Sequence, residues 1–514
     1  MTHWIIAPVI LPALVGPFIV LAARYHMGIQ RIFSVAGVLA LVAVSAGLVW
    51  QTSDGTVLLY QLGDWAAPFG IVIVGDRLST LMVLLTAVLA LFVLLYAIGS
   101  GWDERGRHFH ALYQFQLMGI TGAFLTGDLF NLFVFFEVLL IASYGLMIHA
   151  GGNARLRAGV QYVLFNLLGS TLFLFALGAI YAETGTLNMA DLATRAALVS
   201  PEETAGLRVA AVLLLLVFAI KAALVPLHFW LPSSYAEAPA PVAALFAIMT
   251  KVGAYAIIRV YTIVFPPELE ATAGLHGQWL LWAALISLAI GSIGVLAARK
   301  ADRLVAFAVI GSMGMVMITI SLFTHDSIAA AVYYMIHSTL AAAALFLISD
   351  LMRAGRKNLD LTPQAPVAGA SLTAGMFFVA AIAMAGLPPL SGFIGKLLVL
   401  DAAFDQSAVA YIWAFVLISS LVNVVGFARA GSVFFWKAKS VPATDGDIES
   451  ERPNPLAYVA VAGLLALIVA HTVFAGQMRA YTGLIANDLF APDAYITTVL
   501  ETPGKLSKPT GEGH

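Results

Sequence analysis

The chain has 514 residues, of which 61% are hydrophobic and only 11% are charged, and its formal net charge at pH 7 is −2. Because about a quarter of the residues in an ordinary soluble protein are charged, this composition excludes a soluble globular class and indicates an integral membrane protein. The small net charge argues against a nucleic-acid partner, and the absence of cysteine excludes disulfides and thiolate-held iron–sulfur clusters within this chain.

Apolar runs of about 20 residues, the length a helix needs to cross a bilayer, recur along the chain. The first has no basic segment ahead of it, so we expect a retained helix and not a cleaved signal peptide. The runs lie near 4–23, 32–51, 72–99, 110–126, 129–149, 158–182, 208–234, 240–264, 278–297, 303–323, 327–352, 371–402, 409–436 and 456–476. The sequence therefore predicts an all-α integral membrane protein with about fourteen transmembrane helices.

Three of these runs exceed a simple span and contain proline or glycine: they surround Pro226, the pair Pro388 and Pro389, and Gly426. Proline cannot donate a backbone hydrogen bond, so it interrupts a helix. Backbone that breaks at membrane depth is tolerated only inside protein or beside water. We therefore expect breaks in these runs, and an ion path beside the broken seventh and twelfth helices.

The charge of the loops predicts the orientation of the helices, because basic residues mark cytoplasmic loops. Basic residues occur in odd-numbered loops: Arg24, Arg31, Arg105, Arg107, Arg155, Arg157, Arg299, Lys300, Arg303, Arg353, Arg356, Lys357, Lys437 and Lys439. Five even-numbered loops carry only acidic charges: Asp54, Asp64, Asp128, Glu268, Glu270, Asp326, Asp401 and Asp405. The seventh loop, 233–241, is assigned to the cytoplasm by alternation alone, and both termini are expected outside.

Glu137 lies in the middle of NLFVFFEVLLIASYGL, with apolar residues for more than two turns on either side. Acidic side chains inside a membrane are by default functional and paired, and Lys221 is the expected partner. The alternative is a core carboxyl held neutral by a hydrogen bond. Asp128, nine residues earlier, is about half a turn out of phase on a helix of 3.6 residues per turn. We expect Asp128 to cap the helix at the outer face.

Three lysines, Lys221, Lys251 and Lys396, lie inside or beside strongly apolar runs. A lysine at mid-membrane depth costs roughly 3 kcal/mol on insertion scales, which packing does not explain. Burial favours the neutral amine, and a lysine poised between its neutral and charged forms can receive and pass protons. The alternative for each is a lysine that snorkels to the membrane interface.

His228 and His337 are candidate proton relays, because a histidine accepts on one ring nitrogen and donates on the other. Tyr333 lies one turn before His337 on the same face. The alternative is a hydrogen-bonded structural histidine. Four other histidines fall in loops or at helix ends without metal-ligand spacing: His149, His276, His325 and His471. We expect no metal site.

The helix that contains Lys221 has a later counterpart in FFVAAIAMAGLPPLSGFIGKLLVL, which is again interrupted by proline and again holds one lysine, Lys396. Paired broken helices in two halves of a chain are typical of inverted-repeat transporters. The sequence has no P-loop, no dinucleotide-binding fingerprint and no HExxH motif. We therefore expect no catalytic residues and no cofactor, and an energy source in an ion gradient or another subunit.

The segments TGDLFNLFVFFEVLLIASYGL, FAIKAALVPLHFWLPSSYAEAPAPVAALFA, KVGAYAIIR and GLPPLSGFIGK resemble the antiporter-like proteins shared by Mrp-type Na⁺/H⁺ antiporters and respiratory complex I. The likeness runs from about residue 70 to about residue 440, and the first segment is most similar to D-type Mrp subunits. The resemblance implies a central polar axis of Glu137, Lys221, Lys251 and Lys396, with His337 as the connecting histidine.

The resemblance also implies two inverted five-helix repeats, at 110–264 and 278–436, with flanking helices at 1–109 and a C-terminal helix and polar tail at 437–514. It implies a proton-translocating subunit, and not an enzyme, in a multisubunit Na⁺/H⁺ antiporter of a bacterial cytoplasmic (inner) membrane. The implied partners are subunits of the A, B, C, E, F and G types. The alternative is a proton-pumping subunit of a redox-driven complex, either complex I or a membrane-bound hydrogenase.

Overall fold

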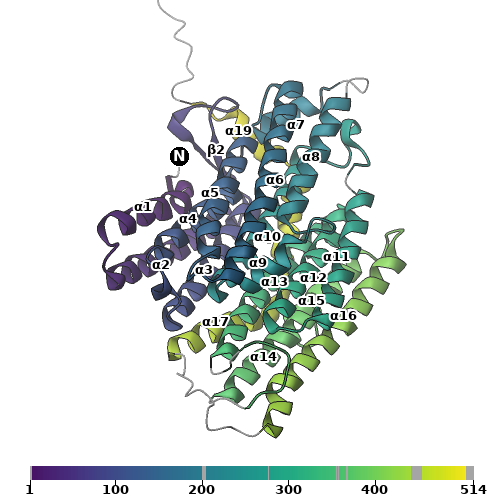
Figure 1. The fold of residues 1–514 in the computed structure, drawn as a ribbon. Helices are drawn as coiled ribbons and strands as arrows, with labels where there is room; N and C mark the ends of the chain where they lie inside the picture. The colour runs from purple at the N-terminus through teal and green to yellow at the C-terminus, as the bar shows by residue number, and fades with distance from the viewer. Residues whose placement is uncertain are drawn as a thin grey trace, which may run out of the picture.

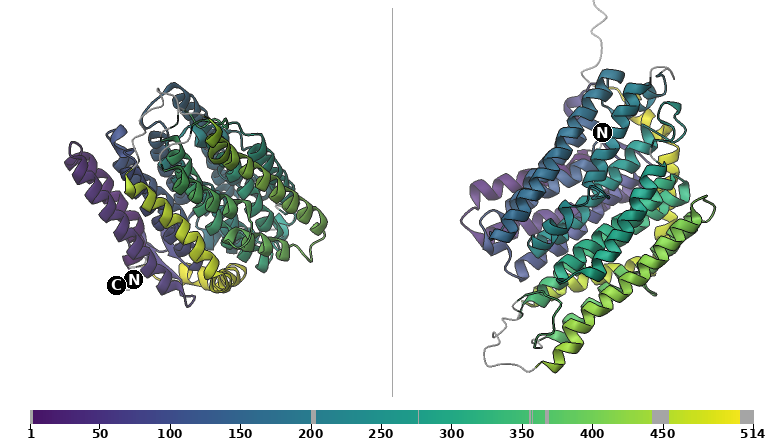
Figure 2. Two further views of the ribbon diagram at one scale, coloured as in Figure 1. Left: turned by 90° about the horizontal axis from the view of Figure 1, so that it is seen from below. Right: turned by 45° about the vertical axis from the view of Figure 1, so that its right-hand side comes forward.

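The computed structural model describes residues 3–199, 204–275, 277–354, 356, 358–365, 369–441 and 454–504. The described chain is a bundle of helices, with the first two helices at one edge and a late helix of the second half at the opposite edge (Figures 1 and 2). Eleven of its helices are long and apolar enough to cross a membrane. The predicted class, an all-α integral membrane protein, is confirmed.

The N-terminal part holds η1 (His3–Ile6), α1 (Ala7–Ala22), α2 (Met27–Thr52), β1 (Leu58–Gln61), η2 (Leu62–Asp64), β2 (Val72–Gly75) and α3 (Arg77–Gly99). The two strands form an antiparallel hairpin, which the all-α prediction did not include. The expected third span, 72–99, therefore began too early. Residues 72–75 are a buried strand, and α3 starts after Asp76, whose carboxylate accepts the backbone N–H of Ser79 at 2.9 Å. An apolar run by itself does not distinguish a strand from a helix start.

The rest of the chain is helical. The first half continues with η3 (Asp103–Arg105), α4 (Phe109–Leu125), α5 (Leu129–Met147), α6 (Asn153–Thr184), α7 (Met189–Ala196), α8 (Ala205–Lys221), α9 (Trp230–Glu237) and α10 (Ala240–Ile263). The second half holds η5 (Glu270–Thr272), α11 (Gly277–Ala297), α12 (Ala301–Leu322), α13 (His325–Arg353), α14 (Ala370–Ala385), α15 (Ser391–Ala402), α16 (Val409–Gly431), η6 (Ser432–Trp436), η7 (Lys437–Ser440), α17 (Pro455–Val473), α18 (Ala475–Phe490) and α19 (Asp493–Glu501).

The helices expected to break around Pro226 and around Pro388 and Pro389 are broken. The first break separates α8 from α9, and the second separates α14 from α15. The expected break at Gly426 is wrong, because α16 runs through this residue without interruption. A Cβ at Gly426 would lie 2.7 Å from Cγ1 of Val295, so glycine lets α16 approach α11 closely.

The count of about fourteen spans stays a prediction. The three expected spans outside the eleven long apolar helices are α4, with 17 residues, and the two broken helices. Each broken helix has one longer half, α8 with 17 residues and α14 with 16, and one shorter half. A helix rises about 1.5 Å per residue, so each half alone falls short of a bilayer of about 30 Å.

Loops predicted on the cytoplasmic side gather at one end of the bundle, here named the basic face. Arg31 of the first loop donates to Asp103 of the third at 2.6 Å. Arg155 of the fifth donates to the backbone carbonyl of Glu237 at 2.8 Å, so the seventh loop, assigned by alternation alone, joins the same face. A cavity of about 550 Å³ at this end is lined by Arg31, Arg105, Asp350, Arg353 and Asn454. Lys357 and residues 442–453 lie outside the described residues.

The opposite end, here named the acidic face, holds the even-numbered loops and the ends of the described chain. His3 packs edge-on against Tyr60, with ring centroids 5.8 Å apart. Asp128 caps α5 by accepting the backbone N–H of Asn131 at 2.8 Å, as predicted. The N-terminal and C-terminal described segments therefore share the face of the acidic loops.

The prediction of a polar tail after residue 476 is wrong for most of the described part. α18 and α19 lie along the acidic face, where Asp488 of α18 pairs with Arg77 at 2.7 Å and His325 contacts the backbone carbonyl of Gly483 at 3.0 Å. Ile485 and Leu489 are buried, whereas Asn487 between them is exposed. Such an amphipathic helix has the mixed composition of a tail, and only its packing partner reveals it.

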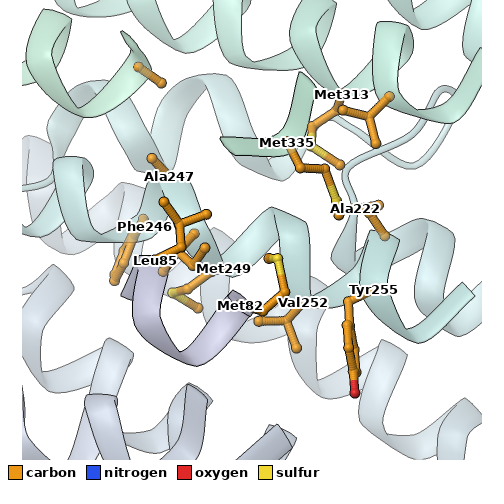
Figure 3. Packing of buried hydrophobic residues seen from close by; sticks show 14 of the residues in the cluster. Met82, Leu85, Ala222, Phe246, Ala247, Met249, Val252, Tyr255, Met313 and Met335 are labelled. Carbon is orange, nitrogen blue, oxygen red and sulfur yellow. The ribbon is translucent and has the colours of Figure 1, made fainter. Parts of the chain in front are cut away.

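The centre of the bundle consists of α10, α12 and α13. Every residue in the most apolar 18-residue window of α10 and of α13 is buried. Figure 3 shows Met249 and Val252 of α10 packed beside Met82 of α3. A polar group at this depth therefore lies in an apolar medium, where an unpaired polar group is expensive.

The contact between α11 and α12 gives a test of the packing. A Cβ at Gly291 would lie 2.3 Å from the backbone nitrogen of Gly311, whereas a Cβ at Gly178 of α6 meets open space. We expect Gly291→Ala to lose about 1–3 kcal/mol of stability by overpacking, seen as a lower melting temperature in detergent. Gly178→Ala, the control with the same gain in helix propensity and no steric conflict, should melt at or slightly above the temperature of the parent. Equal melting of the two variants would contradict the close contact.

Candidate functional site

Glu137 and Lys221 lie on either side of α6. Glu137 of α5 is half-buried and accepts a short hydrogen bond from the hydroxyl of Ser170. Lys221, the last residue of α8, is buried and donates to Oδ1 of Asn166 at 3.4 Å. Its ammonium also lies 5.7 Å from the ring centroid of Phe136. Asn166 and Ser170 are one turn apart on α6, so α6 supplies a polar bridge between the acid and the base.

The direct ion pair expected between Glu137 and Lys221 is not formed in the structure. No carboxylate oxygen of the described residues lies within 4.0 Å of the Lys221 ammonium. The Glu137 carboxylate and the Lys221 ammonium still interact through space. Each group is instead held by a neutral side chain of α6, Glu137 by Ser170 and Lys221 by Asn166. The spacing of these two polar residues, four positions apart in the middle of α6, was the sequence signal for this arrangement.

His228 lies in the break between α8 and α9. The ring is buried, and among the described residues nothing hydrogen-bonds to its Nδ1. α10 approaches this break closely, since a Cβ at Gly253 would lie 2.8 Å from the backbone nitrogen of Ala222. The broken helix therefore packs directly against the helix that carries the next lysine.

Lys251 of α10 is fully buried, and its ammonium has no hydrogen-bond acceptor among the described residues. It lies two positions before Gly253, where α10 meets the end of α8. The snorkelling alternative is therefore not what the structure shows, because a snorkelling lysine carries its head group to the interface. An amine at this position can gain or lose a proton without breaking a direct ion pair.

His337 of α13 lies at the second break. Its Nδ1 is 2.8 Å from the hydroxyl of Ser391, the first residue of α15, while its Nε2 has no hydrogen-bond partner among the described residues. A Cβ at Gly392 would lie 2.7 Å from this Nε2, so only glycine fits beside the ring. The charges of Lys396 and Lys251, one from each half of the chain, both act on this imidazole.

Lys396 of α15 is buried against the end of α14. Its ammonium donates to the backbone carbonyl of Ala385 at 2.6 Å and to the hydroxyl of Ser420 at 2.8 Å. Gly386 adopts φ 74° and lies so close that a Cβ there would be 2.6 Å from the lysine side chain. A small cavity beside Lys396 is also lined by Asn423, whose Oδ1 has no partner among the described residues.

The six predicted residues therefore fall into two groups that meet in the centre. The first break brings Glu137, Lys221, His228 and Lys251 to neighbouring helices, and the second brings His337 together with Lys396. We call these six residues the central row. The sequence analysis did not identify the neutral side chains that contact or adjoin it: Asn166, Ser170, Ser391, Ser420 and Asn423. In the described part of the chain, no three His, Asp or Glu side chains are grouped to hold a metal ion. The titratable members of the row are groups that can bind and release protons.

In contrast to the three lysines, a buried arginine near the acidic face forms a direct ion pair. Arg259 of α10, two turns after Lys251, donates to both carboxylate oxygens of Asp76 at 2.5 and 2.8 Å. Two hydrogen bonds of this kind lock both charges in place. The same helix thus carries one cation that is paired and one that is not.

Comparisons with known proteins agree on one family. The family model described as NADH:quinone oxidoreductase/Mrp antiporter, TM, matches residues 126–422. A probable D-type subunit of a K⁺/H⁺ antiporter from Rhizobium meliloti (strain 1021) is 37% identical over 536 aligned residues, with 98% of each chain covered. The D-type subunit of the Na⁺/H⁺ antiporter of Bacillus subtilis (strain 168) is 37% identical over 514 aligned residues, covering 98% of this chain and 100% of that protein. A chain of the Mrp complex from Dietzia sp. DQ12-45-1b is similar in structure, with a TM-score of 0.87, 27% identity, and coverage of 97% of this chain and 100% of that chain.

Two buried cations on α10 provide a matched test. Lys251→Met removes an amine that has no direct partner, so we expect the thermal stability of the protein in detergent to stay equal or rise. Arg259→Met leaves Asp76 buried and unpaired, so we expect a loss of about 3–5 kcal/mol. If Lys251→Met lowered the melting temperature as much as Arg259→Met, the lysine would be a structural residue.

Proposed function

Because the chain belongs to the NADH:quinone oxidoreductase/Mrp antiporter transmembrane family, we propose that it is the D-type, proton-translocating subunit of a multisubunit monovalent cation/proton antiporter. The two relatives at 37% identity are antiporter subunits, and antiporters are transporters and not enzymes. The names of these relatives differ in the cation, potassium in one and sodium in the other, so the proposal names a monovalent cation.

The observation that carries this proposal is the row of buried amines and imidazoles through the centre of the bundle. Lys221, Lys251 and Lys396 are each buried, and none lies within 4.0 Å of a described carboxylate. An ionisable group in a membrane interior that has no direct charged partner is by default a functional group. Protons pass along Lys221, Lys251, His337 and Lys396, and His228 serves the first break.

The first step takes place across α6. Glu137 acts on Lys221 through Asn166 and Ser170 and through space. When the carboxylate approaches the ammonium, it favours the charged lysine, and when it withdraws, the lysine releases its proton toward Lys251. Two groups coupled in this way titrate as a pair, so a movement of α5 relative to α8 switches the proton affinity of both.

The second half receives the proton at His337. Ser391 holds the Nδ1 side of this imidazole, which leaves Nε2 for proton exchange with its neighbours. Lys396 is held by the carbonyl at the end of α14, and a helix C-terminus favours a cation. The cavity beside Asn423 gives Lys396 a polar neighbour on its far side.

The contact pattern supports the two repeats predicted at 110–264 and 278–436. In the first, α6 packs against both halves of the broken helix, α8 and α9. In the second, α13 packs against both halves, α14 and α15. The third helix of each repeat thus covers the break in the fourth, which is where inverted-repeat transporters bind their ions.

The proposal places the chain in a bacterial cytoplasmic membrane with the basic face in the cytoplasm and both termini outside. The positive-inside rule supports this orientation. The partners are other membrane subunits of the antiporter, of the A, B, C, E, F and G types. Contact with a partner is compatible with the position of Glu137, which is only half-buried in this chain.

A redox-driven proton pump is the alternative function, since the family description names both classes. The full-length relatives at 37% identity, which are antiporter subunits, favour the antiporter. Copurification decides between them: the antiporter function requires small membrane subunits and no iron–sulfur or quinone-reducing subunits.

The proton path gives a prediction for transport. In vesicles that contain the assembled complex, we expect Glu137→Ala, Lys221→Ala and Lys396→Ala each to lose most cation-driven proton flux. The reason is that each removes a titratable group of the row. Lys396→Glu should be milder, because a carboxyl group can also bind and release a proton. His337→Ala should slow transport less than the lysine losses, since water can bridge a missing relay.

Flux should be measured at matched protein levels, with Lys439→Ala as the control, because Lys439 is exposed at the basic face. Full flux in Lys396→Ala would confine the path to the first half. Near-normal flux in Glu137→Ala or Lys221→Ala would show that the substituted residue is structural and not part of the proton path.

The orientation can be tested with two serines that flank α16, because the chain has no cysteine. Ser407 and Ser440 are both exposed, before and after this helix. In intact cells we expect a membrane-impermeant thiol reagent to label Ser407→Cys, and to label Ser440→Cys only after permeabilisation. The reverse pattern would invert the whole orientation.

A further inference from the structure

His471 is a buried histidine that the proton path described above does not use. It lies in the last turn of α17, and its Nδ1 has no hydrogen-bond partner among the described residues. Its ring stacks on Tyr333, with centroids 4.2 Å apart. Two contacts of 3.3 Å join the pair, from the Tyr333 hydroxyl to the His471 carbonyl and from the His471 Nε2 to the Tyr333 carbonyl.

This pair lies directly next to the central row. Tyr333 and His337 are four positions apart on α13 and therefore share a face of that helix. His471 is within electrostatic reach of His337. Each imidazole keeps one ring nitrogen without a partner among the described residues, Nε2 in His337 and Nδ1 in His471. Both rings can therefore exchange a proton at that nitrogen while the rest of the ring stays held.

On its other side the pair lies below a cavity that opens at the acidic face. The cavity has a volume of about 300 Å³, and α13 contributes Ala329 and Ala330, the turn that precedes Tyr333. Its remaining wall includes Asp326, Asp401 and Arg479. The carboxyl side chains of Asp326 and Asp401 are 78% and 71% exposed, so this space is in contact with the aqueous phase. From the centre of the bundle toward the acidic face, α13 thus carries His337, then Tyr333, and then Ala330 and Ala329 at the cavity.

We propose that Tyr333 and His471 form a branch of the proton path that connects His337 with the acidic-face cavity. The proposal rests on the proton-translocating function proposed above. A proton on Nε2 of His337 moves to Nδ1 of His471, assisted by the Tyr333 hydroxyl, and is then released to water in the cavity. His337 is left neutral and accepts the next proton from Lys251 or Lys396, so no charge accumulates on either ring. The reverse sequence carries a proton inward.

The branch assigns a function to the C-terminal helices. α17 contributes His471, and α18 contributes Arg479, Thr482 and Gly483 to the cavity wall. Small residues, among them Ala330, Gly476 and Gly483, line much of the wall, and Ala330 is three positions before Tyr333 on α13. The C-terminal segment thereby builds an aqueous access for the second half of the chain.

The test uses the assembled complex reconstituted in vesicles, with cation-driven proton flux measured at matched protein levels. We expect His471→Gln to lower the flux about tenfold, because glutamine keeps the hydrogen bonds but does not bind a proton near neutral pH. Tyr333→Phe should lower it less, since water can replace the hydroxyl. Flux in His471→Gln equal to that of the parent would overturn the proposal.

His149 provides the matched control. It is also buried and lies just after the end of α5, and its Nε2 also contacts a backbone carbonyl, that of Trp102 at 2.8 Å. It lies at the basic face, away from the row, so His149→Gln should keep the parent flux. An equal loss in both variants would show a general packing effect and overturn the branch.

Chemical rescue separates proton transfer from packing. In His471→Ala we expect millimolar imidazole to restore flux in a concentration-dependent manner. Thiazole, which has a similar size but stays unprotonated near neutral pH, should not restore it. Rescue by both compounds, or by neither, would assign His471 a structural role. If the parent complex shows no cation-driven flux, the proposed function is wrong. If the parent is active and His471→Gln has the same flux, only the branch is wrong.

Discussion

The structure depends on a conflict between burial and charge along the centre of the bundle. Lys221, Lys251 and Lys396 are amines in an apolar interior, and no described carboxylate lies close enough to neutralise them. An amine that forms no direct ion pair can gain or lose a proton without leaving a buried carboxylate unpaired. A fully paired row, like that of Arg259 with Asp76, would be more firmly held but could not exchange protons.

The breaks in two helices make this row possible. A continuous helix satisfies its own carbonyl groups, whereas a helix that ends inside the bundle leaves them for other donors. The carbonyl of Ala385 is one such acceptor, and Lys396 uses it in place of a carboxylate. Lys221 lies at the corresponding end of α8 and is held by a neutral amide, that of Asn166. Dipoles and neutral groups thus support the lysines without fixing their charge.

The sequence by itself determined the membrane class, the two broken helices, the grouping of the loops and the six candidate residues of the path. These features follow from local composition: a charge in an apolar run, or a proline within one, is visible without knowing any contact. The seventh loop shows how far such reasoning extends. Alternation alone assigned it to the basic face, and the contact between Arg155 and Glu237 places it there.

Only the tertiary structure decided which groups meet. Glu137 and Lys221 carry opposite charges, so the sequence favoured a direct pair, but each is held by a neutral side chain of α6. His471 and Tyr333 are 138 positions apart, and no local pattern indicates that their rings stack. Gly426 had the sequence of a break but serves a close helix contact. In each case the deciding quantity is a distance between segments remote in sequence, which composition and periodicity do not contain.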